Sequence, residues 1–318
     1  MRLIYTGLVL VGLVLTASTR AQQNVVRTAD IALRGYTQTD FPRMHKLAEN
    51  VYVYEELQAI GQIEKVFTTN CFIVVTSDGV LVADGLINDE LVSKMLAAIA
   101  KITRQPVKYV VVGADHGDHT GGNAAFPKTA TFIAHPTSAA VLARRANAPG
   151  RPANAPPFPV PTELVADKKI LKMGDTEIQI LFLGRAHTGG DLTVYLPGSH
   201  IMFMSEVYFN RLFPSTYSSY PLEWIAAIKK AEALEASIYV PGHGFIDSPK
   251  VLNEELVTFR TSLEMLEREG RRLHDAGVPL DQAPRQSVLG PFAYWTRAAQ
   301  NLPDGLKRVY LEADGQLK

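Results

Sequence analysis

Short apolar runs alternate along the chain with longer segments in which apolar residues recur at helical spacing. The runs expected to form strands are 51–54, 72–76, 80–83, 107–112, 131–134, 178–183, 192–196, 201–203 and 237–240. Helical spacing marks 89–102, 136–145, 221–234 and 251–274, and a further helix is expected over 292–300. Strands that alternate with helices predict an α/β protein in which helices cover β-sheets.

One tight turn is predicted from its residue types. The strand run 72–76 is followed by Ser77, Asp78 and Gly79, and the next strand run, 80–83, begins at once. An Asp-Gly pair supplies the backbone freedom that a short hairpin turn needs. The two runs are therefore expected to pair as a β-hairpin.

The first 21 residues are typical of an export signal. Arg2 precedes the apolar run 3–15, and small and polar residues then lead to Ala21. The run is too short for a comfortable transmembrane helix. We expect cleavage after Ala21, a periplasmic or secreted protein, and no stable membrane insertion afterwards; an uncleaved anchor is the alternative.

Charge and cysteine content exclude several classes of protein. The 318 residues include 32 Lys and Arg and 32 Asp and Glu, so the formal net charge is zero, and no long basic run is present. We therefore expect no nucleic-acid partner. Cys71 is the only cysteine, which excludes intrachain disulfides and thiolate zinc clusters. Its place in a strand run predicts a small buried side chain.

Histidine and carboxylate side chains gather where predicted strands end. The densest group follows the run 107–112, on a Gly-rich turn. Zinc binds histidine nitrogen and carboxylate oxygen. A single histidine is more often structural, but the repeated position after strands predicts a metal site. Six residues share that position: His116, Asp118, His119, His187, Glu206 and His243.

Five motifs follow one another along the chain. They are Thr69-Asn70-Cys71-Phe72-Ile73, Val80-Leu81-Val82-Ala83-Asp84-Gly85, the His116/Asp118/His119 turn, Ala186-His187-Thr188-Gly189-Gly190-Asp191 and Val240-Pro241-Gly242-His243-Gly244. In this order they resemble the metallo-β-lactamase fold hydrolases, which include glyoxalase II and the class B β-lactamases, and the resemblance covers about 51–244. It implies a four-layer αββα sandwich, with metal ions at one edge of two packed sheets.

The sequence departs from the family pattern His-x-His-x-Asp-His at its first position, where Ala114 stands. Alanine has no donor atom, so the first metal position retains only His116 and His187 of its usual three histidines. Glu206 stands where glyoxalase-like members usually have aspartate, and its extra methylene lets it reach one metal or bridge two. Asp115 is not expected to replace the missing ligand, because neighbouring side chains point apart.

The second metal position of the family, formed by Asp118, His119 and His243, is intact. We expect one zinc ion there, with Glu206 as a possible further ligand. Two other states stay open. A second zinc ion can occupy the incomplete first position with bridging Glu206, or the chain can be an inactive descendant that holds no metal.

The resemblance implies an organisation and a function. After the signal, 22–250 is expected to form the metallo-β-lactamase-like domain, and 251–318 a C-terminal helical extension packed on it. The expected function is an exported zinc-dependent hydrolase that cleaves an ester, thioester or amide bond, lactams included, by metal-activated water. Asp118 is expected to be catalytic, orienting or deprotonating that water. The alternatives are a β-lactamase proper, a catalytically degraded metal- or ligand-binding module, and an iron-dependent oxidoreductase.

The expected partner is a small-molecule substrate. The aromatic loop 208–220 follows a predicted strand, and Tyr208, Asn210 and Arg211 are its candidates for contact with substrate. Asp84 is expected to orient a ligand-bearing turn. The amphipathic helix 251–274 suits either packing on the domain or a homodimer contact.

Overall fold

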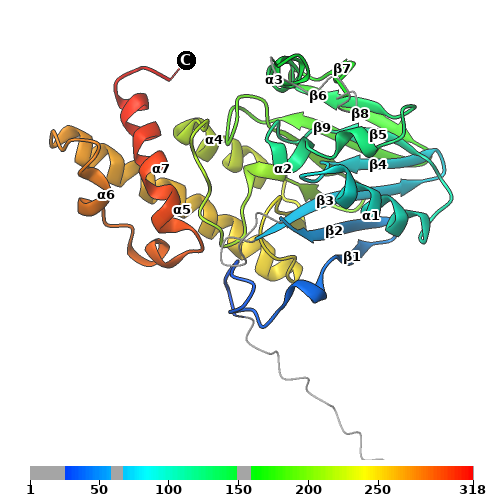
Figure 1. Cartoon of the computed structure of the whole chain (residues 1–318), viewed down its shortest axis with the longest axis horizontal. Helices are drawn as coiled ribbons and strands as arrows, with labels where there is room; N and C mark the ends of the chain where they lie inside the picture. Colours follow the sequence, from blue (N-terminus) through cyan, green and yellow to red (C-terminus); the bar gives the residue numbers. More distant parts are fainter. Residues whose placement is uncertain (1–25, 59–66, 149–158, 318) are drawn as a thin grey trace, which may run out of the picture.

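Two β-sheets form the centre of the structure, a computed structural model that describes residues 26–58, 67–148 and 159–317 (Figure 1). The expected signal sequence, 1–21, lies outside the described residues. The first sheet has seven strands in chain order: β1 (Arg43–Ala48), β2 (Val51–Leu57), β3 (Thr68–Thr76), β4 (Gly79–Ala83), β5 (Val107–Val111), β6 (Thr131–Ala134) and β7 (Glu163–Leu164). The second has the order β12-β11-β10-β9-β8, from β8 (Lys168–Met173), β9 (Thr176–Phe182), β10 (Leu192–Leu196), β11 (Ile201–Phe203) and β12 (Ile238–Val240).

The inner faces of the two sheets pack on each other through apolar side chains. Phe72 of β3 and Phe203 of β11 stack with ring centroids 5.5 Å apart and an interplanar angle of 3°. Leu81 of the first sheet and Val194 of the second belong to the same fully buried cluster. Burial of apolar surface stabilises by roughly 25 cal/mol per Å², so this layer holds the two sheets together.

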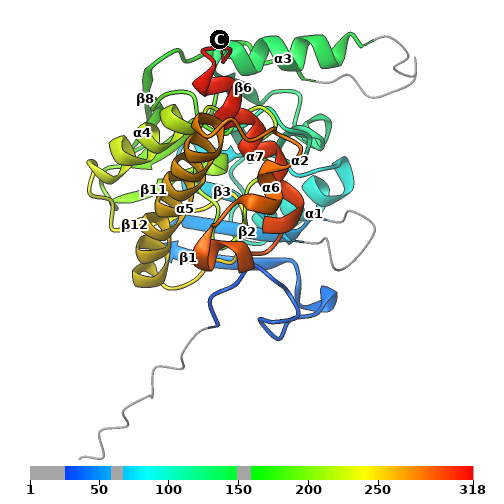
Figure 2. The same ribbon diagram turned by 90° about the vertical axis from the view of Figure 1, so that its left-hand side faces the viewer.

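Helices cover the outer faces of both sheets, as Figures 1 and 2 show. On the first sheet lie α1 (Asp89–Ala100) and α3 (Pro136–Ala146), which bury Met95 and Leu142 against the strands. On the second lie α4 (Pro221–Glu232) and α5 (Pro249–Asp275), which bury Trp224 and Phe259. The layers are therefore αββα, and this confirms the predicted fold class.

The C-terminal residues pack on the same body. Helix α7 (Ala298–Ala313) lies along α5, where Gly270 faces Val309 and Gly305 faces Leu266. Side chains of α5 and α7 share one hydrophobic cluster with α4 and with the loop that carries Tyr208. The remaining short elements are η1 (Gln38–Asp40), α2 (Gly117–Thr120), η3 (Asn123–Ala125), η4 (Ser205–Val207), α6 (Ala283–Gln286) and η5 (Gly290–Tyr294).

Most local predictions agree with the structure. Thr76 pairs with Gly79 in the β3–β4 hairpin, and Cys71 is fully buried. The single helix predicted over 292–300 is wrong. Arg297 has a φ of +66°, and this left-handed residue separates η5 from α7.

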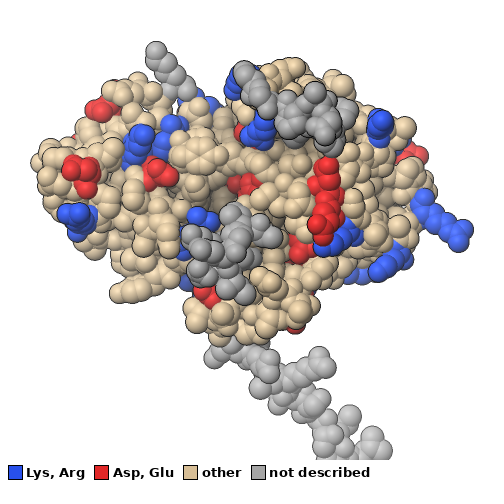
Figure 3. All heavy atoms as spheres, viewed as in Figure 1, with Lys and Arg blue, Asp and Glu red and all other residues tan. Residues whose placement is uncertain are grey.

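The described part of the chain contains no helix long and apolar enough to cross a membrane. Lysines and arginines are scattered over the face in Figure 3 without forming a continuous basic patch. This scattered distribution of basic side chains agrees with a chain whose formal net charge is zero.

Candidate metal centre

The turn that follows β5 presents three of the predicted ligands. His116 is the N-cap of the one-turn helix α2, which carries Asp118 and His119. Gly121 closes the turn with an ordinary φ of −61°. A Cβ at that position would lie 2.0 Å from the carbonyl oxygen of Ile87. Glycine is therefore required here by close contact between two backbone segments, rather than by an unusual backbone conformation.

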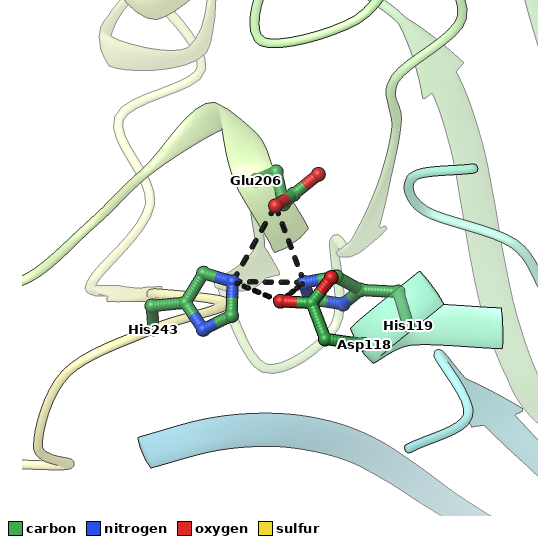
Figure 4. Close-up of side chains that lie close together, drawn as sticks. All are labelled: Asp118, His119, Glu206 and His243. Carbon is green, nitrogen blue, oxygen red and sulfur yellow. Dashed lines mark hydrogen bonds and ion pairs between the residues drawn. The ribbon is translucent and has the colours of Figure 1, made fainter. Parts of the chain in front are cut away.

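Four of the predicted ligands point their donor atoms at one another (Figure 4): Asp118, His119, Glu206 and His243. The Nε2 atoms of His119 and His243 lie 3.0 Å apart. Glu206 Oε1 lies 3.6 Å from the first of these nitrogens and 3.4 Å from the second. Asp118 Oδ2 lies 3.3 Å from His243 Nε2. We call these residues the four-donor group.

The other ring nitrogens of the two histidines fix their tautomers. Nδ1 of His119 lies 2.9 Å from Asp84 Oδ2, and Nδ1 of His243 lies 3.0 Å from the carbonyl oxygen of Thr68. Both partners are hydrogen-bond acceptors, so each Nδ1 carries a proton and donates it. When both rings are neutral, their two Nε2 lone pairs therefore face each other at 3.0 Å. A shared cation satisfies two such lone pairs, and this is the arrangement of metal-bound histidines.

Asp84 holds this part of the site together from a buried position after β4. One oxygen accepts a hydrogen bond from the Gly113 backbone nitrogen at 2.7 Å. The other accepts from Ser205 Oγ at 2.6 Å and from His119. The carboxylate thus connects the ends of three strands, and it orients the ring of His119, a candidate ligand.

The two carboxylates of the four-donor group are ionised. Burial acts to raise the pKa of Asp118, but His119 and His243 lower it more strongly, to about 2. Burial also acts to raise the pKa of Glu206, and the surrounding histidines hold it well below its usual range. Buried negative charge is costly unless a cation is close by. The group is therefore electrostatically suited to a divalent metal ion.

A second group of three donors adjoins the first and shares Glu206. His116 Nδ1 lies 2.9 Å from Glu206 Oε2, and His187 Nε2 lies 3.2 Å from Oε1. Glu206 Oε2 nevertheless receives no well-aligned hydrogen bond from the described residues. On the outer side of His116, Ser218 Oγ lies 3.1 Å from Nε2 and the Tyr217 ring stacks at 5.0 Å. We call His116, His187 and Glu206 the three-donor group.

Among the residues that the structure describes, no side chain replaces the histidine that is missing at Ala114. Ala114 is completely buried, and the neighbouring Asp115 turns away to accept a hydrogen bond from Ser138 Oγ at 3.0 Å. Burial lowers the pKa of His187, which keeps its ring neutral and fit to bind a metal. Imidazole nitrogen and carboxylate oxygen are ligands that zinc accepts. Both groups therefore fit zinc, the four-donor group with the larger set.

Beside the two groups lies a cavity of about 220 Å³. Aromatic side chains line much of it. Two other lining residues come from the C-terminal part of the chain: Arg297, which precedes α7, and Asn301 in its first turn. Sequence reasoning missed these two, because no motif surrounds them. The residues that line the cavity outside the metal groups include Gln58, Phe67, Phe209, Leu212, Phe213, Ser215, Tyr217, Arg297 and Asn301.

The three residues expected to contact substrate, Tyr208, Asn210 and Arg211, do not line this cavity. Tyr208 is fully buried and its hydroxyl donates to a backbone carbonyl of α5. Asn210 donates to a carbonyl oxygen just after β12. Arg211 forms an ion pair with Glu255. The loop does contribute to the cavity, but through Phe209 and its later residues.

Comparisons with known proteins identify relatives of this chain. It is 29% identical over 146 residues to 2,4-dinitroanisole O-demethylase subunit alpha of Nocardioides sp. (strain JS1661), over 44% of this chain and 41% of that protein. It is 23% identical over 216 residues to a metallo-beta-lactamase type 2 of Bacillus sp. (strain 170), over 65% of this chain and 78% of that protein. A solved structure of a metallo-beta-lactamase from Pontibacter korlensis matches with a TM-score of 0.59 at 21% identity, over 69% of this chain and 99% of that one.

The match to the O-demethylase subunit spans less than half of that protein's length. The match to the solved structure agrees with the αββα fold described above. A sequence profile of the Metallo-beta-lactamase superfamily matches residues 65–243, a stretch that contains every residue of the two donor groups. The chain belongs to the metallo-beta-lactamase superfamily.

Proposed function

We propose that this chain is an exported, zinc-dependent hydrolase that cleaves an ester, thioester or amide bond of a small molecule. The single observation that carries the proposal is the 3.0 Å approach of His119 Nε2 to His243 Nε2 beside two ionised carboxylates. Membership of the superfamily supports hydrolytic chemistry. The signal-like sequence 1–21 supports export to the periplasm or the medium.

Zinc would be held first by the four-donor group, because it offers more ligands than the three-donor group. The three-donor group would hold a second ion more weakly, since Ala114 supplies no donor. Zinc in such a site lowers the pKa of water toward neutrality and polarises a carbonyl group.

The protein's own residues position water and substrate. Asp118 faces the cavity and is ionised at neutral pH, because its pKa is about 2. A carboxylate with so low a pKa is a weak base. Asp118 therefore acts by accepting a hydrogen bond from water and fixing its direction, rather than by removing a proton. Phe67 and Tyr217 contribute aromatic surface to the cavity that would receive the substrate.

The test is a metal titration joined to a substrate screen. Purified full-length protein is depleted of metal, resupplied with zinc, and assayed with an ester, a thioester and an amide. His243→Ala and Asp118→Ala should lose most of the activity. His135→Asn is a matched control, because His135 caps α3 through its side chain and asparagine is a good N-cap.

Two outcomes would decide against the proposal. Metal-depleted wild type that retains full activity, together with unaffected variants, would remove zinc from the mechanism. Wild type that binds zinc but hydrolyses none of the substrates would indicate a catalytically degraded binding module, the alternative that Ala114 raises.

A β-lactamase proper is the second candidate, because relatives from Bacillus carry the name metallo-beta-lactamase type 2. Export also favours it, since β-lactams act outside the cytoplasm. Nitrocefin hydrolysis with added zinc separates this candidate from the first. Turnover of nitrocefin far above that of simple esters would favour a β-lactamase.

Aryl ethers should also be tested as substrates in the same screen. The relative from Nocardioides is named as an O-demethylase subunit for 2,4-dinitroanisole, and the cavity of the present chain has aromatic walls. Release of an alcohol from such an ether, with esters untouched, would replace carbonyl substrates by ethers in the proposal.

A further inference from the structure

Arg297 brings a positive charge to the cavity from the C-terminal part of the chain. It stands immediately before α7, and its side chain lines the cavity together with Asp118 and Glu206. Its guanidinium carbon lies 5.5 Å from the ring centroid of Phe67, on the cavity wall. The residue is thus part of the same chamber as the two donor groups, although it is far from them in sequence.

No acidic group neutralises this arginine among the described residues. Its side chain forms no ion pair of up to 4.0 Å with another described residue, and its guanidinium lies against the Phe67 ring. Arg211, which also lies against an aromatic ring, Trp295, forms an ion pair with Glu255. Arg297 therefore faces the cavity without an ion-pair partner among the described residues.

The helix that follows Arg297 adds to this positive potential. Helix α7 has no acidic residue in its first turn, and Arg297 gives it no side-chain cap. The N-terminus of a helix carries a partial positive charge that favours nearby anions. The helix dipole and the guanidinium therefore act in the same direction at this wall of the cavity.

The backbone around Arg297 is fixed to the loop that forms the rest of the wall. The Phe213 nitrogen donates to the Thr296 carbonyl at 2.9 Å, and Asn301 Nδ2 donates to the Phe213 carbonyl at 2.7 Å. Between these two ties Arg297 adopts a φ of +66°. A non-glycine residue in this conformation is strained, and such residues cluster at functional sites. The position is therefore held by the structure rather than left free.

The size and the walls of the cavity limit what Arg297 can bind. The volume of about 220 Å³ lies below the range of roughly 300–1,000 Å³ that is usual for ligand pockets. Phe67, Phe209, Phe213 and Tyr217 make its walls apolar. Arg297 supplies a single positive charge at this wall of the cavity, which one carboxylate balances. The planar guanidinium also matches a carboxylate with two parallel hydrogen bonds.

We propose that Arg297 is a specificity residue that binds the carboxylate of a small, monoanionic substrate with an apolar body. The inference rests on the hydrolase function proposed above, and it names the substrate class of that site. The carboxylate lies against Arg297, the apolar body lies between the aromatic walls, and the bond to be cleaved reaches the donor groups.

The first test compares two esters of matched shape in zinc-supplemented full-length protein. The para-nitrophenyl monoester of succinate ends in a carboxylate, and para-nitrophenyl isocaproate replaces that carboxylate with an isopropyl group. Loss of a charge-assisted hydrogen-bond pair should lower kcat/KM for the succinate ester roughly tenfold to hundredfold in Arg297→Asn. The isocaproate ester should be hydrolysed as before. Asparagine tolerates the left-handed backbone, so this variant keeps the local fold.

Two further variants act as controls for the same pair of esters. Arg297→Lys keeps the charge and should retain part of the preference for the succinate ester. Arg285→Asn removes an exposed arginine of α6 that does not line the cavity, and should change neither rate. An equal loss for both esters in Arg297→Asn would overturn the proposal in favour of a purely structural role.

The second test measures binding without turnover. Calorimetric titration of the same proteins with benzoate should show affinity at least tenfold weaker in Arg297→Asn, while the neutral analogue benzamide should show no difference. Benzoate binding that depends on Arg297, in a protein that hydrolyses neither ester, would uphold the anion site and remove the hydrolase proposal. Ester hydrolysis without any dependence on Arg297 would uphold the hydrolase proposal and remove the anion site.

Discussion

His119 and His243 approach each other through their Nε2 atoms at 3.0 Å, while the Nδ1 atom of each ring lies within hydrogen-bond distance of an acceptor in the protein. Two neutral rings held this way repel each other unless a cation lies between or beside them. In the absence of metal, a proton must supply that charge. Burial lowers the pKa of His119, but Asp84 and Glu206 raise it more, to well above its usual value. The same geometry therefore binds a proton or a metal ion.

Zinc should consequently stabilise the fold. A ligand present at 1,000 times its Kd stabilises the folded state by about 4 kcal/mol, which corresponds to a rise in Tm of roughly 10 °C for a protein of this size. Differential scanning calorimetry of metal-depleted protein, with and without added zinc, measures the shift. His243→Ala should abolish most of it, and His135→Asn should retain it. A shift of equal size in His243→Ala would place the bound zinc elsewhere.

The positions of the candidate ligands were predictable because each follows an apolar strand and belongs to a motif of the family. The residues that form the cavity walls could not be predicted in this way. Tyr208, Phe209 and Asn210 alternate along an extended segment, and neighbouring side chains on such a segment point to opposite sides. Phe209 faces the His243 ring at 4.9 Å, whereas its two neighbours face α5 and the segment after β12. A sequence shows that such a loop is aromatic but not which of its alternating residues face inward.

The strands that sequence reasoning missed lie at sheet edges. β1 is an edge strand of the first sheet and β8 of the second, and neither is mainly buried. Strand β8 carries Lys168, Lys169 and Lys172, which interrupt the apolar pattern. Charged side chains, lysine above all, are typical of edge strands because they discourage pairing with other chains. The break in the predicted helix at Arg297 depends on a single backbone angle. The spacing of apolar residues does not reveal such an angle.

Restoring the missing histidine should complete the three-donor group. Ala114→His is expected to bind a second zinc ion at concentrations at which wild type holds one. The larger side chain enters a fully buried position, and overpacking typically costs about 1–3 kcal/mol. Zinc stoichiometry by plasma mass spectrometry after gel filtration measures the gain.

Ala114→Leu is the control for that gain, because it adds similar bulk without a donor atom. It should bind no additional zinc and should lose stability to a similar degree. One zinc ion per chain in both variants would show that the position of residue 114 does not reach the three-donor group.

Phe259 of α5 supports the site from behind, and its removal should destabilise the whole protein. Its ring lies 5.7 Å from that of Phe209 and 5.6 Å from that of Trp224. Phe259→Ala leaves a cavity in a fully buried position, and such changes cost about 3–5 kcal/mol. Urea unfolding followed by fluorescence measures the loss. Val257→Ala, on the exposed face of the same helix, should change the free energy of unfolding by no more than about 0.5 kcal/mol.

Equal effects of Phe259→Ala and Val257→Ala would contradict the packing of α5 described above. A large loss limited to Phe259→Ala would support one cooperative body. It would also mean that the residues after 250 contribute to the back wall of the metal centre, because Phe209 contacts Phe259 on one side and His243 on the other.

Glu312 of α7 should give the stability of the protein a distinctive pH dependence. Burial raises its pKa to about 7, and the nearby charges of Glu267 on α5 and Glu223 on α4 add to the rise. Arg271 opposes it weakly, with Nη2 4.0 Å from the carboxylate. The unfolded chain has the ordinary pKa of 4.5, so the folded state binds the proton more tightly than the unfolded state between these two values.

The contribution of Glu312 to stability must therefore fall as the pH rises from about 4.5 to about 7, because the folded state has to lose a proton that it holds in preference to the unfolded state. Glu312→Gln removes this dependence. It should match wild type at pH values near 4.5 and should exceed it above neutral pH. Urea unfolding of metal-depleted proteins across this range measures the difference without interference from zinc binding. Asp304→Asn removes an exposed carboxylate from the same helix, and the stability of this variant should follow the pH dependence of wild type. A Glu312→Gln curve parallel to wild type would show that Glu312 ionises normally in the folded protein.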